Sequence, residues 1–378
     1  MSLELDQVFV IDEGAEDAFG TAHQKMEASR AAGDERGRAL ALIKAADALV
    51  TMGKPDDAMG YVGEAQYMCG EMKFEEGRAA AMNVMTKIHA KKGKDEEELE
   101  EALDSATDAL KAFRKLGYRK GEAVALTSLS MVHQASKKAT LAVKAAKEAL
   151  AIFAELGDKR AMAVTYGTVK DSYLAKTPAE TFLAAKQMEK AQALYQELGD
   201  KSKEASCLLS VAKIEAADAK KAAAAVHKAA ALSAEAGDAK GQAAALDTAV
   251  TMLLDGGLYF EAVKAAKQRV TIFRGAGDAS EEGRAMLKLG DVYMKNEDAE
   301  KAGKVGEAAM GIFAGVNDME GMKSAKELVD GAKHAVAVSE IEASISKASS
   351  AMHVPKTLIV DPGLNKRVTS AFGSALAY

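Results

Sequence analysis

The sequence predicts an all-α protein, a right-handed α-α superhelix in which helical hairpins stack as a solenoid. Three observations lead to this prediction. Hydrophobic residues make up 48% of the chain but aromatic residues only 5%, so alanine, the best helix former, supplies much of the apolar content. Only four prolines occur in 378 residues, which leaves room for long helices. The chain also repeats itself, as hairpin arrays do.

A Gly-Asp dipeptide marks each repeat. Its copies and their variants are Gly33-Asp34, Lys73-Phe74, Gly117-Tyr118, Gly157-Asp158, Gly199-Asp200, Gly237-Asp238, Gly277-Asp278 and Asn317-Asp318. The spacing gives a period of about 40 residues, which is typical of helical hairpin arrays. Glycine can end one helix in the left-handed conformation, and aspartate can cap the start of the next. Each dipeptide therefore predicts a junction between two hairpins.

A ladder of small residues runs through the second helix of each predicted hairpin. The alanine pairs are Ala58/Ala65, Ala102/Ala109, Ala142/Ala149, Ala184/Ala191, Ala222/Ala229 and Ala302/Ala309. Seven residues are two helical turns, so both alanines of a pair face the same way and allow close helix packing. Arg269 takes the place of the second alanine after Ala262. Either that helix is locally splayed, or Arg269 extends along the surface.

The seventh predicted hairpin contains the fullest motif, with Leu289-Gly290 and Tyr293 in its first helix and Ala302 and Ala309 in its second. In this motif, the recurring Gly-Asp dipeptides and the alanine pairs, residues 34–330 resemble the tetratricopeptide-repeat (TPR) family. The long period and Gly-Asp turns are similar to the subclass of polarity adaptors and kinesin light chains. The polarity-adaptor resemblance implies an Asn in each first helix that binds ligand backbone. The matching positions are instead Lys44, Val84, Ser128, Thr168, Ser210, Thr248 and Gly290.

The repeat predicts the organisation of the whole chain. We expect an N-terminal segment with a half-repeat capping helix over 1–33, about seven TPR-like hairpins over 34–318, a capping helix over 319–352 and a tail outside the repeat over 353–378. Caps cover the apolar stacking faces at both ends. In the tail, apolar residues recur at every fourth position, at Leu364, Val368, Phe372 and Leu376. This stripe suits a helix that folds back on the solenoid or docks on another molecule, and a disordered tail is the third possibility.

The sequence favours binding over catalysis. It lacks the phosphate-binding, zinc-hydrolase and serine-hydrolase motifs, and its six histidines and two cysteines are scattered. We therefore expect no enzyme, no catalytic residue, no cofactor and no metal. The net charge of −6 gives no electrostatic case for a nucleic-acid partner. Without a signal peptide or a membrane-spanning apolar run, the predicted location is cytoplasmic.

The first helix of each hairpin is expected to line the concave side of the solenoid. The predicted groove residues are Asn83, Lys87, Thr127, Met131, Gln134, Asp171, Lys213, Asp247 and Asp291. The predicted function is a non-enzymatic scaffold or adaptor that holds a protein partner in this groove. The alternative is a structural subunit that assembles head to tail, because the first twenty residues are acidic and the tail is basic. We also expect Leu126, Leu129 and Phe153 in the core and a packing role for His133.

Overall fold

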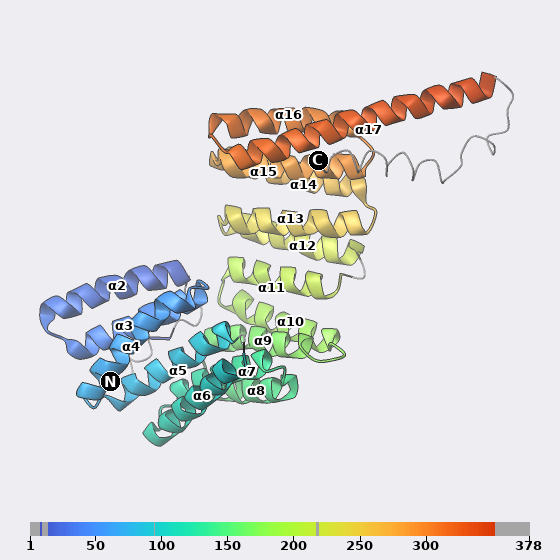
Figure 1. Cartoon of the computed structure of the whole chain (residues 1–378). Helices are drawn as coiled ribbons and strands as arrows, with labels where there is room; N and C mark the ends of the chain where they lie inside the picture. Colours follow the sequence, from blue (N-terminus) through green and yellow to red (C-terminus); the bar gives the residue numbers. More distant parts are fainter. Residues whose placement is uncertain (1–7, 10–13, 94, 217–218, 352–378) are drawn as a thin grey trace. The chain divides into compact units, whose positions relative to one another are not determined.

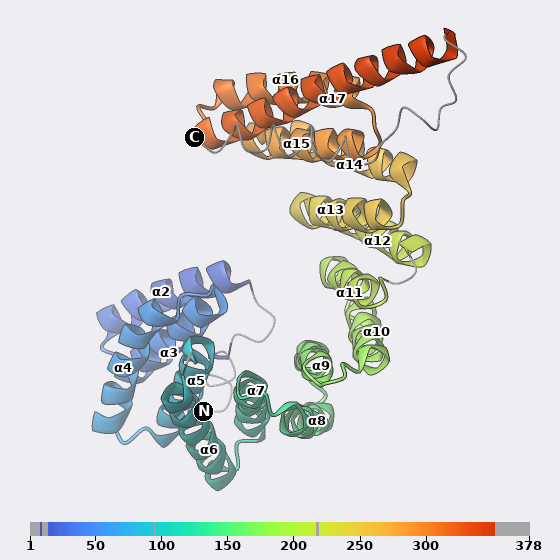
Figure 2. The same cartoon turned by 45° about the vertical axis from the view of Figure 1, so that its right-hand side comes forward.

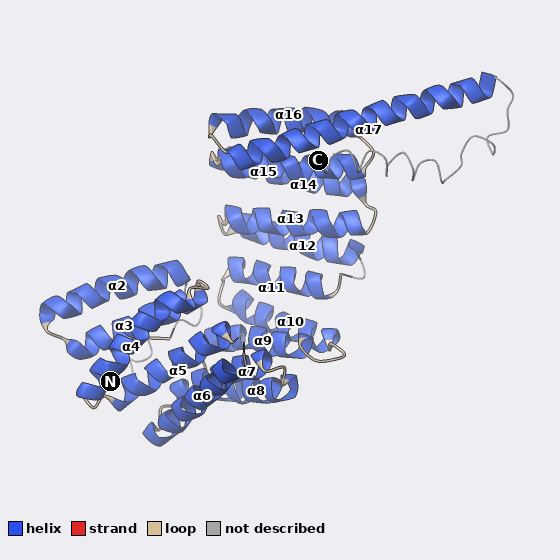
Figure 3. Cartoon of the chain, viewed as in Figure 1, coloured by secondary structure: helices blue, strands red, loops and turns tan. Residues whose placement is uncertain are grey.

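The computed structural model describes residues 8–9, 14–93, 95–216 and 219–351, and every regular element within them is an α-helix (Figures 1 and 3). The all-α prediction is therefore confirmed. The helices are α2 (Ala15–Ala32), α3 (Glu35–Thr51), α4 (Pro55–Glu71), α5 (Glu75–Lys92), α6 (Glu96–Leu116), α7 (Arg119–Ala135), α8 (Ala139–Glu155), α9 (Lys159–Leu174), α10 (Thr181–Glu197), α11 (Lys201–Ile214), α12 (Ala219–Glu235), α13 (Ala239–Asp255), α14 (Tyr259–Ala276), α15 (Ala279–Lys295), α16 (Ala299–Gly315) and α17 (Met319–Ala351). Taken in order, α3 to α16 make seven hairpins, preceded by α2 and followed by α17.

The chain forms two compact units, residues 1–248 and 249–378. In the first unit, consecutive helices pack against each other from α2 and α3 through to α11 and α12. The first helices of neighbouring hairpins also pack side by side, α3 with α5, α5 with α7, and α7 with α9. These first helices form one layer, and the second helices pack behind them, as the TPR-like pattern predicts.

The Gly-Asp junctions have the geometry that the sequence predicts. Gly157, for example, is left-handed with φ of 68°, and the Asp158 side chain accepts a hydrogen bond from the Ala161 N–H at 3.0 Å. Asp34, Asp200, Asp238, Asp278 and Asp318 cap helices in the same way. Lys73 and Asn317 occupy the left-handed conformation in the variant junctions, with φ of 52° and 57°.

The paired alanines are buried at every position of the ladder, at most 2% exposed. Arg269 does not extend along the surface, which was one of the two alternatives that the sequence left open. Its side chain is only 15% exposed, and its guanidinium nitrogen lies 3.8 Å from a carboxylate oxygen of Glu281. Its guanidinium carbon also lies 5.3 Å from the ring centre of Phe273. Arg269 therefore lies between α14 and α15 instead of extending along the surface.

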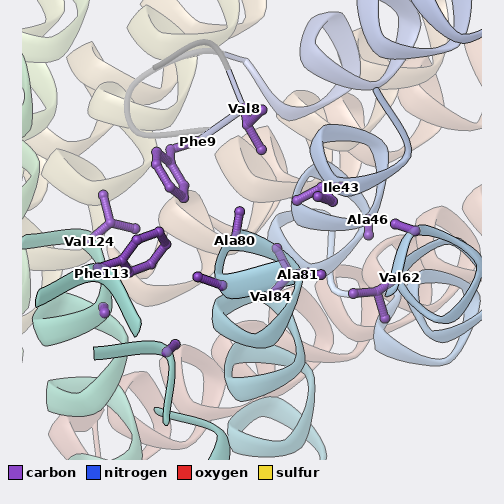
Figure 4. Packing of buried hydrophobic residues seen from close by; sticks show 14 of the residues in the cluster. Val8, Phe9, Ile43, Ala46, Val62, Ala80, Ala81, Val84, Phe113 and Val124 are labelled. Carbon is purple, nitrogen blue, oxygen red and sulfur yellow. The ribbon is translucent and has the colours of Figure 1, made fainter. Parts of the chain in front are cut away.

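Two residues of the N-terminal segment, which precedes α2, belong to the core of the first unit. Val8 and Phe9 are 3% and 6% exposed. The Phe9 ring meets Phe113 edge-on at 6.2 Å (Figure 4). It also stacks on Tyr118 at 6.4 Å. The N-terminal segment is therefore joined to the junction between the second and third hairpins as well as to the capping helix that follows it.

Two of the three core residues predicted for the third repeat are buried, since Leu126 and Phe153 are each 2% exposed. Leu129 is only partly buried and packs against the edge of the core. Leu129 is therefore a peripheral member of the core, although it lies on the same face of α7 as fully buried Leu126.

The second unit is closed by α17, which packs on α15 and α16 (Figure 2). Glycines permit this close approach. A Cβ atom at Gly290 would lie 2.3 Å from Leu328, and one at Gly306 would lie 2.8 Å from Val329. The small residue expected in the first helix of the seventh hairpin thus makes room for a side chain of α17.

Candidate binding groove

A cavity of about 280 Å³ opens on the layer of first helices in the first unit. Its walls come from α3, α5, α7 and α9, and Phe153 of α8 also borders it. Three of the predicted groove residues, Lys87, Thr127 and Met131, line this cavity together. The repeat places them there because equivalent turns of successive first helices lie side by side.

The cavity combines apolar side chains with hydroxyl groups. Val124, Met131, Phe153 and Val164 supply the apolar part. The Thr127 hydroxyl donates to the Ala123 carbonyl at 3.0 Å. Such a surface can hold an apolar side chain of a partner while leaving hydrogen-bonding groups at its margin.

One hydroxyl at the cavity has no partner. The Ser128 Oγ atom is buried and makes no hydrogen bond within the part of the chain that the structure describes. A buried unpaired hydroxyl carries a desolvation cost. Ser128 occupies the position at which the polarity-adaptor resemblance implies an Asn, so the equivalent site keeps a polar group in a shorter side chain.

Lys87 is not a free cation of the groove. Its Nζ atom lies 2.6 Å from Oδ1 of Asp47, and the two side chains are 16% and 1% exposed. The pair links α3 to α5. Because Asp47 neutralises Lys87, the remaining basic residue of the cavity lining is Lys91, one helical turn further along α5 and exposed to solvent.

The side chain of Gln134 on α7 forms hydrogen bonds to α9. Its Nε2 donates to the Thr168 carbonyl at 3.1 Å and to the Ser172 hydroxyl at 2.7 Å. Ser172 in turn donates to the Thr168 carbonyl at 2.8 Å. Gln134 therefore joins α7 to α9 and fixes the spacing of two walls of the cavity.

The placement predicted for Asn83 is wrong. Asn83 is fully buried, and neither atom of its side-chain amide has a hydrogen-bond partner in the described part of the chain. Each residue turns a helix by about 100°, so an error of one position moves a side chain from the groove face into the core. Val84, its neighbour, is also fully buried.

The other predicted groove residues do not join the cavity. Asp171 is exposed and pairs with Lys170 at 2.8 Å. Lys213 on α11 is exposed, and Asp247 on α13 is half-buried. Asp291 is on α15 of the second unit, also at an exposed position. The four tail residues Leu364, Val368, Phe372 and Leu376 lie outside the described residues.

Sequence reasoning missed Asp47 and Lys91. Asp47 precedes Lys87 by one repeat period, so a search for opposite charges 40 residues apart would have found the pair. Lys91 follows Lys87 by four residues, the spacing that puts two side chains on one helix face.

The histidines and cysteines of the described residues lie apart from the cavity lining. Among the described residues, no group of His, Cys, Asp or Glu could hold a metal ion. Cys69 and Cys207 are buried, and burial raises the pKa of the Cys69 thiol to about 11. That thiol is therefore protonated and unreactive at neutral pH. No helix of the described chain is long and apolar enough to cross a bilayer.

Comparison with known proteins identifies the fold. No family model and no curated protein sequence matches the chain. Among solved structures, the signal transduction ATPase PH0952 from Pyrococcus horikoshii, which has a tetratricopeptide repeat sensor, is 14% identical with a TM-score of 0.51. The match covers 84% of this chain and 52% of that one, so the chain spans about half of the ATPase.

Two further structures match with lower TM-scores. BtubC (BKLC) from P. vanneervenii is 19% identical over 60% of this chain and 93% of that chain, with a TM-score of 0.46. Aspartyl phosphate phosphatase F from Bacillus subtilis is 10% identical over 86% and 95% of the two chains, also at 0.46. The likeness to the TPR sensor shows a TPR-like helical-repeat fold.

Proposed function

We propose that this chain is a protein-binding scaffold whose first unit holds a segment of a partner protein in the groove of first helices. The observation that carries the proposal is the cavity of about 280 Å³ formed by four successive first helices. It is large enough for a bulky apolar side chain, and its floor is apolar. Exposed Lys91 at its margin favours a partner segment with an acidic residue beside that side chain.

The lining of the cavity supports binding and not catalysis. It contains lysines, hydroxyl residues and apolar residues, but no carboxylate, histidine or cysteine among the described lining residues. General acid–base catalysis needs a group that exchanges a proton near neutral pH. We therefore propose a non-enzymatic role, with recognition through shape and charge.

The mode of binding that we propose differs from backbone clamping by an Asn ladder. None of the equivalent positions carries an Asn, and at the cavity these positions hold the shorter hydroxyl side chains of Ser128 and Thr168. Instead, one side chain of the partner enters the cavity, and the neighbouring residues of the partner contact the exposed faces of α5, α7 and α9. The TPR sensor of the PH0952 ATPase is consistent with a recognition role for this fold.

Substitution of Met131 by glutamate tests the groove. A carboxylate in the cavity removes apolar contact and must be desolvated when a partner binds. We expect at least a tenfold loss of partner protein captured from native cells by immobilised Met131→Glu, quantified by mass spectrometry against the unchanged chain. Leu141→Glu is the matched control, because Leu141 is 46% exposed on α8 and lies outside the cavity lining.

The control separates the groove from a general effect of added charge. Partners that bind the groove are lost with Met131→Glu and kept with Leu141→Glu. Equal recovery with the two variants, with helicity unchanged by circular dichroism, would contradict the proposal. Lys87 is unsuitable for this test, because any change there also breaks its ion pair with Asp47.

A further inference from the structure

Only the first part of α17 packs against the second unit. The helix is 33 residues long, and Ala325, Val329 and Ala332 are buried. All residues from 337 to 347 are exposed. In both views the helix continues well past its neighbours α15 and α16 (Figures 1 and 2). The outer half of α17, defined here as residues 337–347, therefore has no neighbour within the described chain.

The outer half of α17 carries an apolar stripe. Val338, Ile341 and Ile345 are 39%, 59% and 47% exposed. Their spacing of three and four residues puts them on one helix face. Alternation of three and four is the pattern of a seam that packs against another helix. The stripe therefore has the spacing of a surface that packs against another helix.

This outer half is a poor helix on its own. It contains three β-branched residues and the serines Ser339, Ser344 and Ser346. Both kinds of residue have low helix propensity. Among the described residues 337–347 there is no ion pair to support it. Packing of the stripe against a partner would supply the missing stability.

The chain itself continues with a matching segment. Residues 352–378 follow directly, and Leu364, Val368, Phe372 and Leu376 recur at every fourth position, which puts them on one side of a helix. As a helix, residues 364–376 would be about 20 Å long, against about 17 Å for the outer half of α17. The connecting residues 352–363 can span up to about 40 Å, and they end in an Asp361-Pro362-Gly363 turn sequence.

Charge favours the tail as the segment that covers the stripe, and tethering favours the tail of the same chain over that of a second molecule. The tail carries Lys356, Lys366 and Arg367 against Asp361, whereas the outer half of α17 carries two glutamates against one lysine. A short tether gives an effective concentration on the order of millimolar. A second copy of the chain at micromolar concentration competes poorly with it.

We propose that residues 364–376 bind as a helix along Val338, Ile341 and Ile345 of the same chain. The outer half of α17 and this segment then form a last helical hairpin at the C-terminal end of the solenoid. The tail on this account closes its own chain, and it does not link one copy to the next.

Amide hydrogen exchange of the full chain tests this docking. In Phe372→Glu a carboxylate replaces a central member of the tail stripe, so docking should fail. We expect the amides of residues 338–347 to exchange at least tenfold faster in Phe372→Glu than in the unchanged chain, with α14 to α16 unaffected. Phe260→Glu is the control, because Phe260 is 81% exposed on α14 and should leave exchange in 338–347 unchanged.

Light scattering and dilution identify the occupant. A monomer mass, with protection of residues 338–347 that does not change on dilution, supports docking within one chain. A dimer mass, or protection that is lost on dilution, would show that a second copy covers the stripe and would overturn the proposal. Equal exchange in Phe372→Glu and the unchanged chain would also overturn it, because the tail would then make no contact.

Discussion

Lys87 and Asp47 form a buried ion pair between neighbouring repeats, with Nζ and Oδ1 2.6 Å apart. Removing Lys87 leaves the Asp47 carboxylate buried without this partner. We expect Lys87→Met to lower the free energy of unfolding by about 2–3 kcal/mol, below the range for a fully enclosed pair because water can reach the site through the gap left by lysine. Urea denaturation followed by circular dichroism measures the change.

Two further variants isolate the charge. Asp47→Asn combined with Lys87→Met should recover part of the lost stability, because a neutral amide then replaces the buried carboxylate that lost its ion pair with Lys87. Lys91→Met removes the exposed lysine one turn away and should change stability by less than about 0.5 kcal/mol. A loss for Lys91→Met as large as that for Lys87→Met would mean that the ion pair is not the cause.

The Phe9 ring joins the N-terminal segment to the junction between the second and third hairpins through Phe113 and Tyr118. Truncation to alanine removes these ring contacts and exposes their apolar partners. We expect Phe9→Ala to cost about 1–3 kcal/mol, less than a central core truncation because the segment can detach without unfolding the hairpins. Hydrogen exchange should show faster opening near Tyr118. Tyr67→Ala, at a site 70% exposed, should have little effect.

The junctions show why the fold could be predicted from the sequence. A left-handed glycine and an aspartate cap act over a few residues, and the chain repeats this local signal at most hairpin junctions. Helix positions, hairpin number and the buried alanines all follow from that spacing. Even the variant junction at Lys73 adopts the same backbone conformation as Gly157, because the flanking helices impose it.

The groove was less predictable because it depends on helix rotation and on contacts between repeats. Asn83 and Lys87 are four residues apart on α5, yet one is buried in the core and the other reaches the cavity. The periodicity fixed the helix but not its rotation to within one residue. The pairing of Lys87 with Asp47 and the burial of Phe9 join segments far apart in the sequence, and no local pattern indicates them.

Two junction glycine positions offer opposite changes in stability. Gly157 has φ of 68°, and a Cβ atom there would meet no other atom within 4 Å. Gly157→Ala should therefore cost only the backbone strain, about 1–2 kcal/mol. Lys73 already bears that strain at φ of 52°, so Lys73→Gly should stabilise the chain by about 0.5–1 kcal/mol. Thermal unfolding of both variants measures the two shifts, and shifts of the same sign would contradict this account.

His133 makes stability depend on pH. Burial in the third hairpin lowers the pKa of its imidazole below the ordinary value, and the nearby Lys138 ammonium lowers it further. The unfolded chain keeps the ordinary histidine pKa of about 6.5. Between these two values the unfolded state binds more protons, so stability rises with pH and is lost as the pH falls through 6.5 towards the folded pKa.

Replacing His133 by asparagine should remove this contribution. Asparagine does not titrate, so the difference between unfolding midpoints at pH 7.5 and pH 5.5 should be smaller in His133→Asn than in the unchanged chain. Carboxylates titrate in both proteins, and comparing the two differences cancels their effect. His334→Asn is the control, since His334 is exposed on α17. If His133→Asn keeps the full pH dependence of the unchanged chain, the buried imidazole is not its source.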